Sequence, residues 1–169
     1  MKPFYIIEEK SKISKDALLK SALARCGISD FEYAVSETGK PYLKNSRMCI
    51  SKSDTKNYIA VAVSDTDIGI DIEEASRRAD IQALSSRFFC REEQEYIASQ
   101  NDIHRAFLKI WTRKEALLKA DGIGIRVKLN SFNTVPDTVT FNNNRYTFLD
   151  TDTSEDIICS VCIRNNLLD

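Results

Sequence analysis

The sequence predicts an α+β protein made of two similar lobes, and three observations support this class. Short segments near both ends of the chain alternate apolar and polar residues, as half-buried strands do. Residues 78–120 instead have the 3.6-residue period of helices. The pattern A-L-L-K occurs at residues 17–20 and again at 116–119, each time before a Gly-Ile pair. The order of helix followed by strands therefore occurs twice.

Composition excludes several other classes. The chain has 169 residues, of which 43% are hydrophobic, and this is typical of a globular protein rather than a disordered one. With 24 basic and 25 acidic side chains, the near-neutral charge argues against nucleic-acid binding or membrane-surface binding as the main function. The sequence also lacks an apolar run of the ~18 residues that a membrane span needs. We therefore expect a cytoplasmic protein.

The first part of the chain predicts one helix and five strands. Ser14 can cap a helix that runs to about Cys26 and is stopped by Gly27. Residues 37–41 have the composition of a turn. The polar residues 65–67 form a short connection that predicts a hairpin between the last two strands. We expect the strands at residues 3–7, 31–35, 47–51, 58–64 and 68–73.

The second part predicts helices followed by a further set of strands. The helical region between Arg78 and Ala120 has breaks near Cys90 and near Asp102, which can cap the last helix. Residues 121–124 end that helix with two glycines. Asn142–Asn144 predict a tight turn. We expect the strands at residues 126–129, 138–141, 145–149 and 157–163.

The cysteines and the single histidine do not indicate a metal site. The five cysteines are too few for a disulfide framework in a chain of this length. Cys159 and Cys162 have metal-like spacing, but residues three apart on a strand point to opposite faces. We expect buried, unreactive thiols there and a structural or surface role for His104.

Charge is distributed unevenly along the chain. Residues 1–56 carry 11 basic and 7 acidic groups, whereas residues 57–125 carry 9 and 12, and the remainder carries 4 and 6. A site that binds an anion on one wall and a cation on the other would need such an asymmetry. Scattered surface charge would produce the same count.

Two charged patterns are candidates for chemistry. In the strand at residues 68–73, Asp71 and Glu73 share the face opposite the isoleucines, so they form either a hard-metal site or a solvent-facing pair. Further on, Glu115 and Lys119 are four residues apart on a helix and share a face with Trp111. Such a pair is also a common decoration of exposed helices. Neither pattern decides the question alone.

Together with other segments, these patterns resemble one family. The strand G-I-D-I-E is followed by R-F-F-C-R-E-E at residues 87–93, then W-T-R-K-E-A-L-L-K at 111–119 and G-I-G-I, with G-K-P upstream at 39–41. Their order and spacing resemble a 4'-phosphopantetheinyl transferase of the surfactin-synthetase-activating (Sfp) type, from about Gly39 to the C-terminus. The resemblance implies two α+β lobes related by a pseudo-twofold axis. It also implies transfer of the phosphopantetheine arm of coenzyme A to a serine of an apo acyl- or peptidyl-carrier protein, which releases adenosine 3',5'-bisphosphate.

The same resemblance assigns roles to residues in the second lobe. It implies that Asp71, Glu73 and Glu115 bind Mg²⁺, a cation that takes carboxylate and phosphate oxygens. Glu115 either ligates the metal or removes the serine proton, and these two roles stay open. Lys119 matches the lysine that lies against the pyrophosphate of the substrate.

The resemblance also implies a wall for the nucleotide phosphates, formed by Lys40, Ser51 and Lys52. Family members usually have Ser-His-Ser where this chain has Ser51-Lys52-Ser53, and that histidine approaches the ribose phosphate. A lysine keeps the positive charge, so we expect phosphate binding with altered geometry; an ordinary solvated lysine is the alternative. The first 38 residues have no counterpart, which leaves the adenine contacts open.

We expect residues 1–66 to form the nucleotide-binding lobe and residues 67–169 to form the lobe with the metal and catalytic residues. Because Asp71 follows a lobe's length of sequence, we expect a monomer that meets its carrier protein transiently. Two other functions stay open: a relative that binds coenzyme A or a carrier protein without transfer, and an unrelated Mg²⁺-dependent phosphoesterase.

Overall fold

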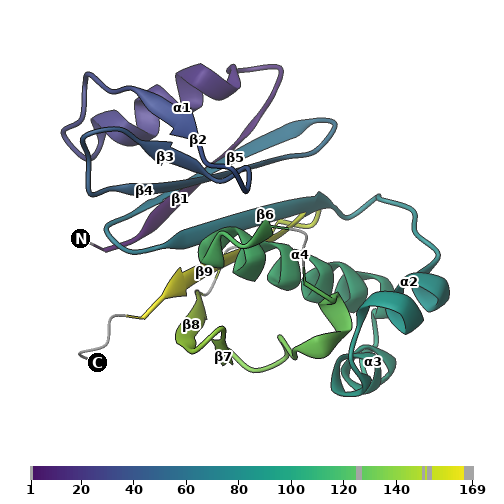
Figure 1. Cartoon of the computed structure of the whole chain (residues 1–169). Coiled ribbons are helices and arrows are strands. Elements are labelled where there is room, and N and C mark those ends of the chain that lie inside the picture. Colours follow the sequence, from purple (N-terminus) through teal and green to yellow (C-terminus); the bar gives the residue numbers. More distant parts are fainter. Residues whose placement is uncertain (1, 125–126, 150, 152–153, 166–169) are drawn as a thin grey trace.

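The protein has four layers in the order helix, sheet, sheet, helix (Figure 1). The structure is a computed structural model and describes residues 2–124, 127–149, 151 and 154–165. Its mixture of helices and antiparallel sheets confirms the α+β class. The elements in chain order are β1 (Phe4–Glu9), α1 (Lys15–Ala24), β2 (Tyr33–Val35), β3 (Pro41–Leu43), β4 (Cys49–Asp54), β5 (Tyr58–Ser64), β6 (Ile68–Glu74), α2 (Ile81–Phe88), α3 (Arg91–Ala98), α4 (Ile103–Asp121), the 3₁₀ helix η2 (Leu129–Ser131), β7 (Thr138–Phe141), β8 (Asn144–Leu149) and β9 (Ile157–Arg164).

The first helix and the first sheet form the upper two layers of Figure 1. The sheet has the strand order β1-β5-β4. The side chain of Ser14 caps α1 by accepting a hydrogen bond from the amide of Ala17, as the sequence predicts. The leucines of α1 are buried against Ile50 of β4 and against alternate residues of β5. The hairpin β2–β3 extends this core with Leu43, which is buried.

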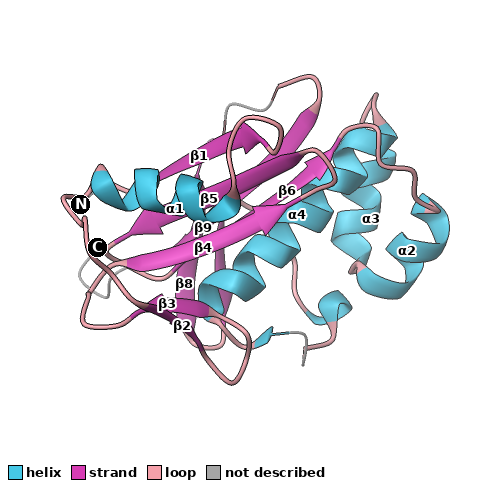
Figure 2. Cartoon of the chain, turned by 90° about the horizontal axis from the view of Figure 1, so that it is seen from above, coloured by secondary structure: helices cyan, strands magenta, loops and turns pink. Residues whose placement is uncertain are grey.

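The second sheet has the order β6-β9-β8-β7, and α4 packs on one of its faces. Its other face packs against the first sheet, where Ile70 and Ile72 meet Ala60 and Ala62. The polar face of β6 therefore points toward α4. Gly69 allows this close approach, since a Cβ atom there would lie 1.9 Å from the carbonyl oxygen of Ala116. In Figure 2, α2 and α3 lie at one end of the molecule, away from α1.

The predicted hairpin between residues 58–64 and 68–73 is wrong, although both strands exist. β5 pairs with β1 and β4, whereas β6 pairs with β9 in the other sheet. The connection at residues 65–67 carries the chain from one layer to the next, because the apolar faces of the two strands pack on each other. On the edge of β6 that faces β4, the Ser51 hydroxyl accepts the amide of Ile70 at 3.0 Å. The Ser53 hydroxyl accepts the amide of Ile72 at 3.3 Å.

The predicted strand at 126–129 is also wrong where it can be compared. Residues 125 and 126 lie outside the described residues, residues 127 and 128 are not in a strand, and η2 begins at Leu129. The physical reason is the side chain of Lys114, whose ammonium donates to the carbonyls of Leu129 and Phe132 at 2.6 and 2.9 Å. These carbonyls need no neighbouring strand. The sequence does not predict the short strand β3, because Pro41 ends a segment with the composition of a turn.

The sequence expectations for the helix breaks, for Cys159 and Cys162 and for His104 are confirmed. The helical region divides near Cys90 and Asp102, and the Asp102 side chain caps α4 through the amide of Arg105. Cys159 and Cys162 lie in different cores on opposite sides of β9. His104 has a structural contact, because its Nε2 atom lies 2.7 Å from the carbonyl oxygen of Arg77. Within the described residues, no helix is both long and apolar enough to cross a membrane.

Candidate active site

The site is centred on Asp71, on the face of β6 that packs against α4. Its side chain is almost fully buried, with 7% of the residue exposed. The Lys119 ammonium lies 2.7 Å from the carboxylate and also donates to the carbonyl of Ile70 at 3.0 Å. Ser53, from β4, donates its hydroxyl to the same carboxylate oxygen at 2.8 Å. Burial raises the pKa of Asp71 even though Lys119 and Ser53 act to lower it.

Glu73 lies two residues further along β6 and forms an ion pair with Arg77. The Arg77 guanidinium also sits over the Trp111 ring of α4, 5.2 Å from its centroid. The sequence pattern does not identify Arg77 as a site residue. The spacing carries no signal, because Arg77 follows the end of the strand, where the two-residue period no longer applies.

Glu115 comes from α4 and belongs to the same electrostatic environment. Within the described part of the chain, its carboxylate has no hydrogen bond or ion pair. Burial is the main cause that raises the pKa of Glu115, followed by repulsion from Asp71. Burial likewise raises the pKa of Glu73, to which Asp71 and Glu115 also contribute. The fold therefore brings the three predicted acids close enough to oppose one another's ionisation.

The fit of a metal ion to these acids depends on both their chemistry and their arrangement. Their donors are all carboxylate oxygens, which suit a hard cation such as Mg²⁺. Yet among the described residues, no group of three or more His, Cys, Asp or Glu side chains is arranged to hold a metal ion. Lys119 and Arg77 occupy the carboxylates of Asp71 and Glu73. The chemistry of the donors therefore suits such an ion, whereas in this structure the carboxylates of Asp71 and Glu73 are bound to side chains of the chain itself.

A cavity of about 270 Å³ opens beside the acids, between the β2–β3 turn, β4 and the C-terminal half of α4. Five of the predicted site residues line it: Lys40, Ser51, Lys52, Glu115 and Lys119. Asp71 and Glu73 do not line the cavity. A larger cavity of about 460 Å³, bounded by α3, α4 and β9, contains none of the predicted site residues. The chemistry therefore favours the smaller cavity.

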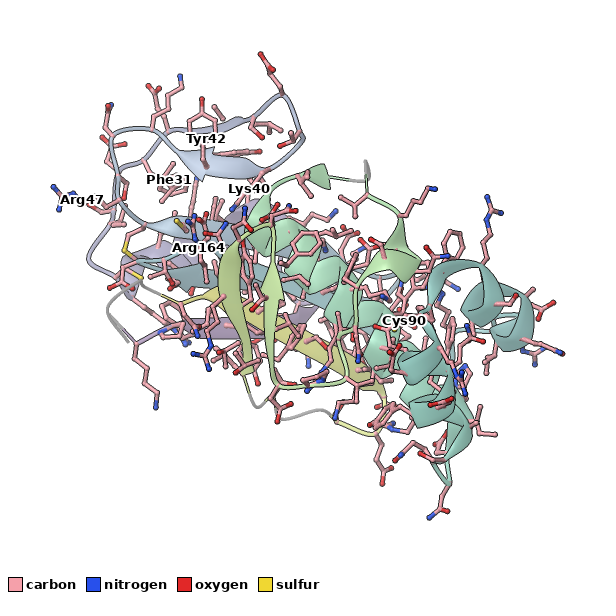
Figure 3. All side chains as sticks on the ribbon, turned by 60° about the horizontal axis from the view of Figure 1, so that its bottom comes forward. Phe31, Lys40, Tyr42, Arg47, Cys90 and Arg164 are labelled. Carbon is pink, nitrogen blue, oxygen red and sulfur yellow. The ribbon has the colours of Figure 1, made fainter. Side chains whose placement is uncertain are left out.

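Two of the predicted phosphate-wall residues make structural bonds. The Lys40 ammonium donates to Asp67 at 2.7 Å and to the carbonyl of Ala120, near the end of α4, at 2.6 Å. Arg164 binds the other oxygen of Asp67 at 3.3 Å; Figure 3 labels both cations. The hydroxyl of Ser51, a residue only 3% exposed, accepts the amide of Ile70. Lys40 and Ser51 thus join segments that are distant in sequence.

The third wall residue, Lys52, has a different environment. Its ammonium lies over the ring of Tyr33, 4.5 Å from the centroid. No ion pair of Lys52 with an acid occurs among the residues that the structure describes. Its charge is therefore not neutralised at the edge of the cavity.

The motif residues Glu93 and Lys114 form a buried ion pair away from the cavity. The two side chains are 0% and 1% exposed, and their charged atoms lie 2.8 Å apart. Glu93 also accepts hydrogen bonds from the amides of Cys90 and Thr134 and from the Thr134 hydroxyl. With the two carbonyls bound by Lys114, this network holds the segment around η2 against α3 and α4.

Comparisons with known proteins agree with the resemblance seen in the sequence. The family model of the 4'-phosphopantetheinyl transferase superfamily matches residues 67–162, more than half of the chain. The chain is 33% identical to the 4'-phosphopantetheinyl transferase gsp of Aneurinibacillus migulanus, over 75% of this chain and 56% of that protein. The values for HetI of Nostoc sp. are 33%, 72% and 56%, and those for Sfp of Bacillus subtilis are 28%, 69% and 54%. The chain thus spans about half the length of the curated relatives it matches.

Proposed function

Because the chain belongs to the 4'-phosphopantetheinyl transferase superfamily, we propose that it transfers the 4'-phosphopantetheine arm of coenzyme A to a serine of an apo acyl- or peptidyl-carrier protein. The other product is adenosine 3',5'-bisphosphate. The main supporting observation is the cavity where Glu115 and Lys119 line one side and Lys52 lines another. Coenzyme A carries negative charge on its pyrophosphate and on its nucleotide, so its binding site needs a cation near each of these two groups.

The reaction is a phosphoryl transfer to an alcohol. The serine oxygen of the carrier protein forms a bond to the β-phosphorus of coenzyme A, and the bond from that phosphorus to the bridging oxygen breaks. Such a reaction depends mainly on alignment and on neutralisation of charge. Lys119 supplies a cation beside the leaving bisphosphate. It also keeps a hydrogen bond to the backbone of β6, and this fixes its position.

Glu115 is the group we propose for the serine proton, at its carboxylate oxygens. Its raised pKa makes it a better proton acceptor than an exposed glutamate. The other role, ligation of the metal, uses the same oxygens. Asp71, Glu73 and Glu115 would together hold Mg²⁺, which supplies charge neutralisation at the pyrophosphate when it is bound.

We further propose that Lys40, Ser51 and Lys52 form the wall for the nucleotide phosphates. Lys52 contributes its free charge, whereas Lys40 and Ser51 fix the shape of the wall through their bonds to α4 and β6. In this assignment, residues 1–66 are the nucleotide lobe, residues 67–169 are the catalytic lobe, and the protein acts as a monomer. The first sheet and the second sheet fall on either side of this boundary.

One observation favours a second candidate function. Asp71 and Glu73 each pair with a cation of the chain itself, and this would suit a protein that binds coenzyme A without transfer. The two candidates differ in whether magnesium recruits these acids in the presence of the substrate.

Intact-mass measurement decides between them. We expect that protein with Mg²⁺ and coenzyme A adds about 340 Da, the mass of one phosphopantetheine group, to an apo carrier protein. Asp71→Ala should abolish the addition while the circular dichroism spectrum stays unchanged. Absence of the mass shift with every member of a panel of apo carriers, together with calorimetric binding of coenzyme A, would establish the second candidate.

A further inference from the structure

Tyr33 contacts Lys52, which lines the cavity, and belongs to a part of the sequence to which the resemblance assigns no role. In the hairpin β2–β3, Tyr33 pairs with Leu43 and therefore shares a face with it. That face turns toward the core of the first lobe, since Leu43 is buried. Tyr33 itself is 42% exposed, which is unusual for an aromatic residue on an inward face. Its ring is covered on one side by the ammonium of Lys52.

The contact restrains Lys52 without neutralising it. A lysine side chain rotates about four bonds and loses considerable conformational entropy when it is fixed in one position. An aromatic face attracts an ammonium group through its quadrupole and carries no net charge. Lys40, on the same cavity, instead forms an ion pair with Asp67. Of these two lysines, Lys52 is thus the one held in place with its full charge available.

We propose that Tyr33 is a positioning residue that holds the Lys52 ammonium for the 3'-phosphate of coenzyme A, so that the protein distinguishes coenzyme A from 3'-dephospho-coenzyme A. The proposal rests on the proposed function. Lys119 occupies the side of the cavity next to the acids, which suits the pyrophosphate. Lys52, on β4 beside the hairpin, is then left for the phosphorylated ribose at the other end of the nucleotide.

The test compares the two substrates in four variants. Tyr33→Ala should lower kcat/KM for coenzyme A about 5-fold through KM, the effect of losing one exposed cation–π contact, and leave 3'-dephospho-coenzyme A unchanged. Tyr33→Phe keeps the ring and should restore the discrimination. Lys52→Ala should lower kcat/KM for coenzyme A at least as much as Tyr33→Ala does. The double variant Tyr33→Ala/Lys52→Ala should show no larger loss than Lys52→Ala alone.

Tyr42 provides the matched control. It lies on the same hairpin, pairs with Ala34 on the opposite face, and is 47% exposed. Tyr42→Ala should change neither substrate's kinetics. Equal losses for both substrates in Tyr33→Ala, or no loss for either, would overturn the proposal while leaving the transfer activity established.

Calorimetry separates this proposal from the function on which it rests. If the wild-type protein transfers nothing to any carrier, the proposed function fails, and the affinities for the two nucleotides still test Tyr33. Weaker binding of coenzyme A alone in Tyr33→Ala supports the positioning role. Unchanged binding of both nucleotides rejects it.

Discussion

Lys114 and Glu115 are neighbours on α4, yet they lie in opposite environments. Lys114 is buried in an ion pair with Glu93, and its ammonium also donates to two backbone carbonyls. Glu115 faces the cavity without a bonded partner among the described residues, and its pKa is raised. Adjacent charged residues of one motif can therefore have separate roles, one in stability and the other in function. A satisfied charge holds the fold, and an unsatisfied one is available to a ligand.

The largest expected effect comes from disrupting the packing of α4, the helix that carries both residues, on β6. Gly69→Ala places a methyl group where the backbone of α4 lies, since the added carbon would be 1.9 Å from the Ala116 oxygen and 2.5 Å from the Ala120 nitrogen. A side chain could relieve such an overlap by changing its rotamer, but the backbone of α4 cannot. We expect failure to fold, measured as loss of the cooperative thermal transition. A normally folded Gly69→Ala protein would show that α4 does not pack this tightly on β6.

The next effect breaks the buried pair. Lys114→Met leaves the Glu93 carboxylate buried without a cation and frees two carbonyls, so we expect a loss of about 3–5 kcal/mol in the free energy of unfolding. Chemical denaturation measures it. Combining Lys114→Met with Glu93→Gln removes the uncompensated charge and should recover part of the loss. If Lys114→Met were as stable as the wild type, the ion pair of Lys114 with Glu93 would not stabilise the fold.

Glu115→Gln should have the opposite profile. The pKa of Glu115 in the folded protein is raised above its ordinary value of 4.5, so the folded state loses stability as pH rises through the interval between these two values. At pH 7 the native protein carries this cost, and Gln removes it. We expect a more stable variant at pH 7, no difference well below pH 4.5, and a loss of activity of about 10²–10⁴-fold.

Unfolding curves at the two pH values and transfer rates to a carrier protein test this profile. A variant that is both less stable and fully active would reverse the assignment of Glu115. Glu95→Gln on α3 is a suitable control, because Glu95 is exposed and forms its ion pair with Arg91 in solvent.

The smallest effect concerns a charge that is neither buried nor in the site. Asp54 binds Lys10 and Lys15 at 2.7 and 2.6 Å. Burial acts to raise the pKa of Asp54, but the two hydrogen bonds outweigh it and lower this pKa below 3.8. Its contribution is therefore present above pH 3.8 and lost as the pH falls further. Asp54→Asn should cost less than about 1 kcal/mol at pH 7, and high salt should erase the difference between the two proteins.

Periodicity in the sequence predicted which acidic and basic residues share a face, and the family resemblance then supplied their expected roles. The two-residue period of the strand placed Asp71 and Glu73 on one face, and the four-residue spacing placed Glu115 beside Lys119. Partners from distant segments were out of reach. Nothing in the local pattern shows that Lys40 binds Asp67, or that Arg77 turns back to Glu73, because these contacts exist only once the layers have packed. The hairpin error has the same origin, since a short polar connection fits a hairpin and a change of layer equally well.

The way β4 meets β6 has a mechanical consequence. Backbone ladders fix the strands within each sheet, but at this junction two serine hydroxyls substitute for peptide carbonyls. A hydroxyl reorients by rotating about one bond, whereas a ladder shifts only by breaking in register. At this junction the position of β4 against β6 therefore depends on the side-chain torsions of Ser51 and Ser53 and on the apolar packing between the sheets, rather than on a continuous backbone ladder.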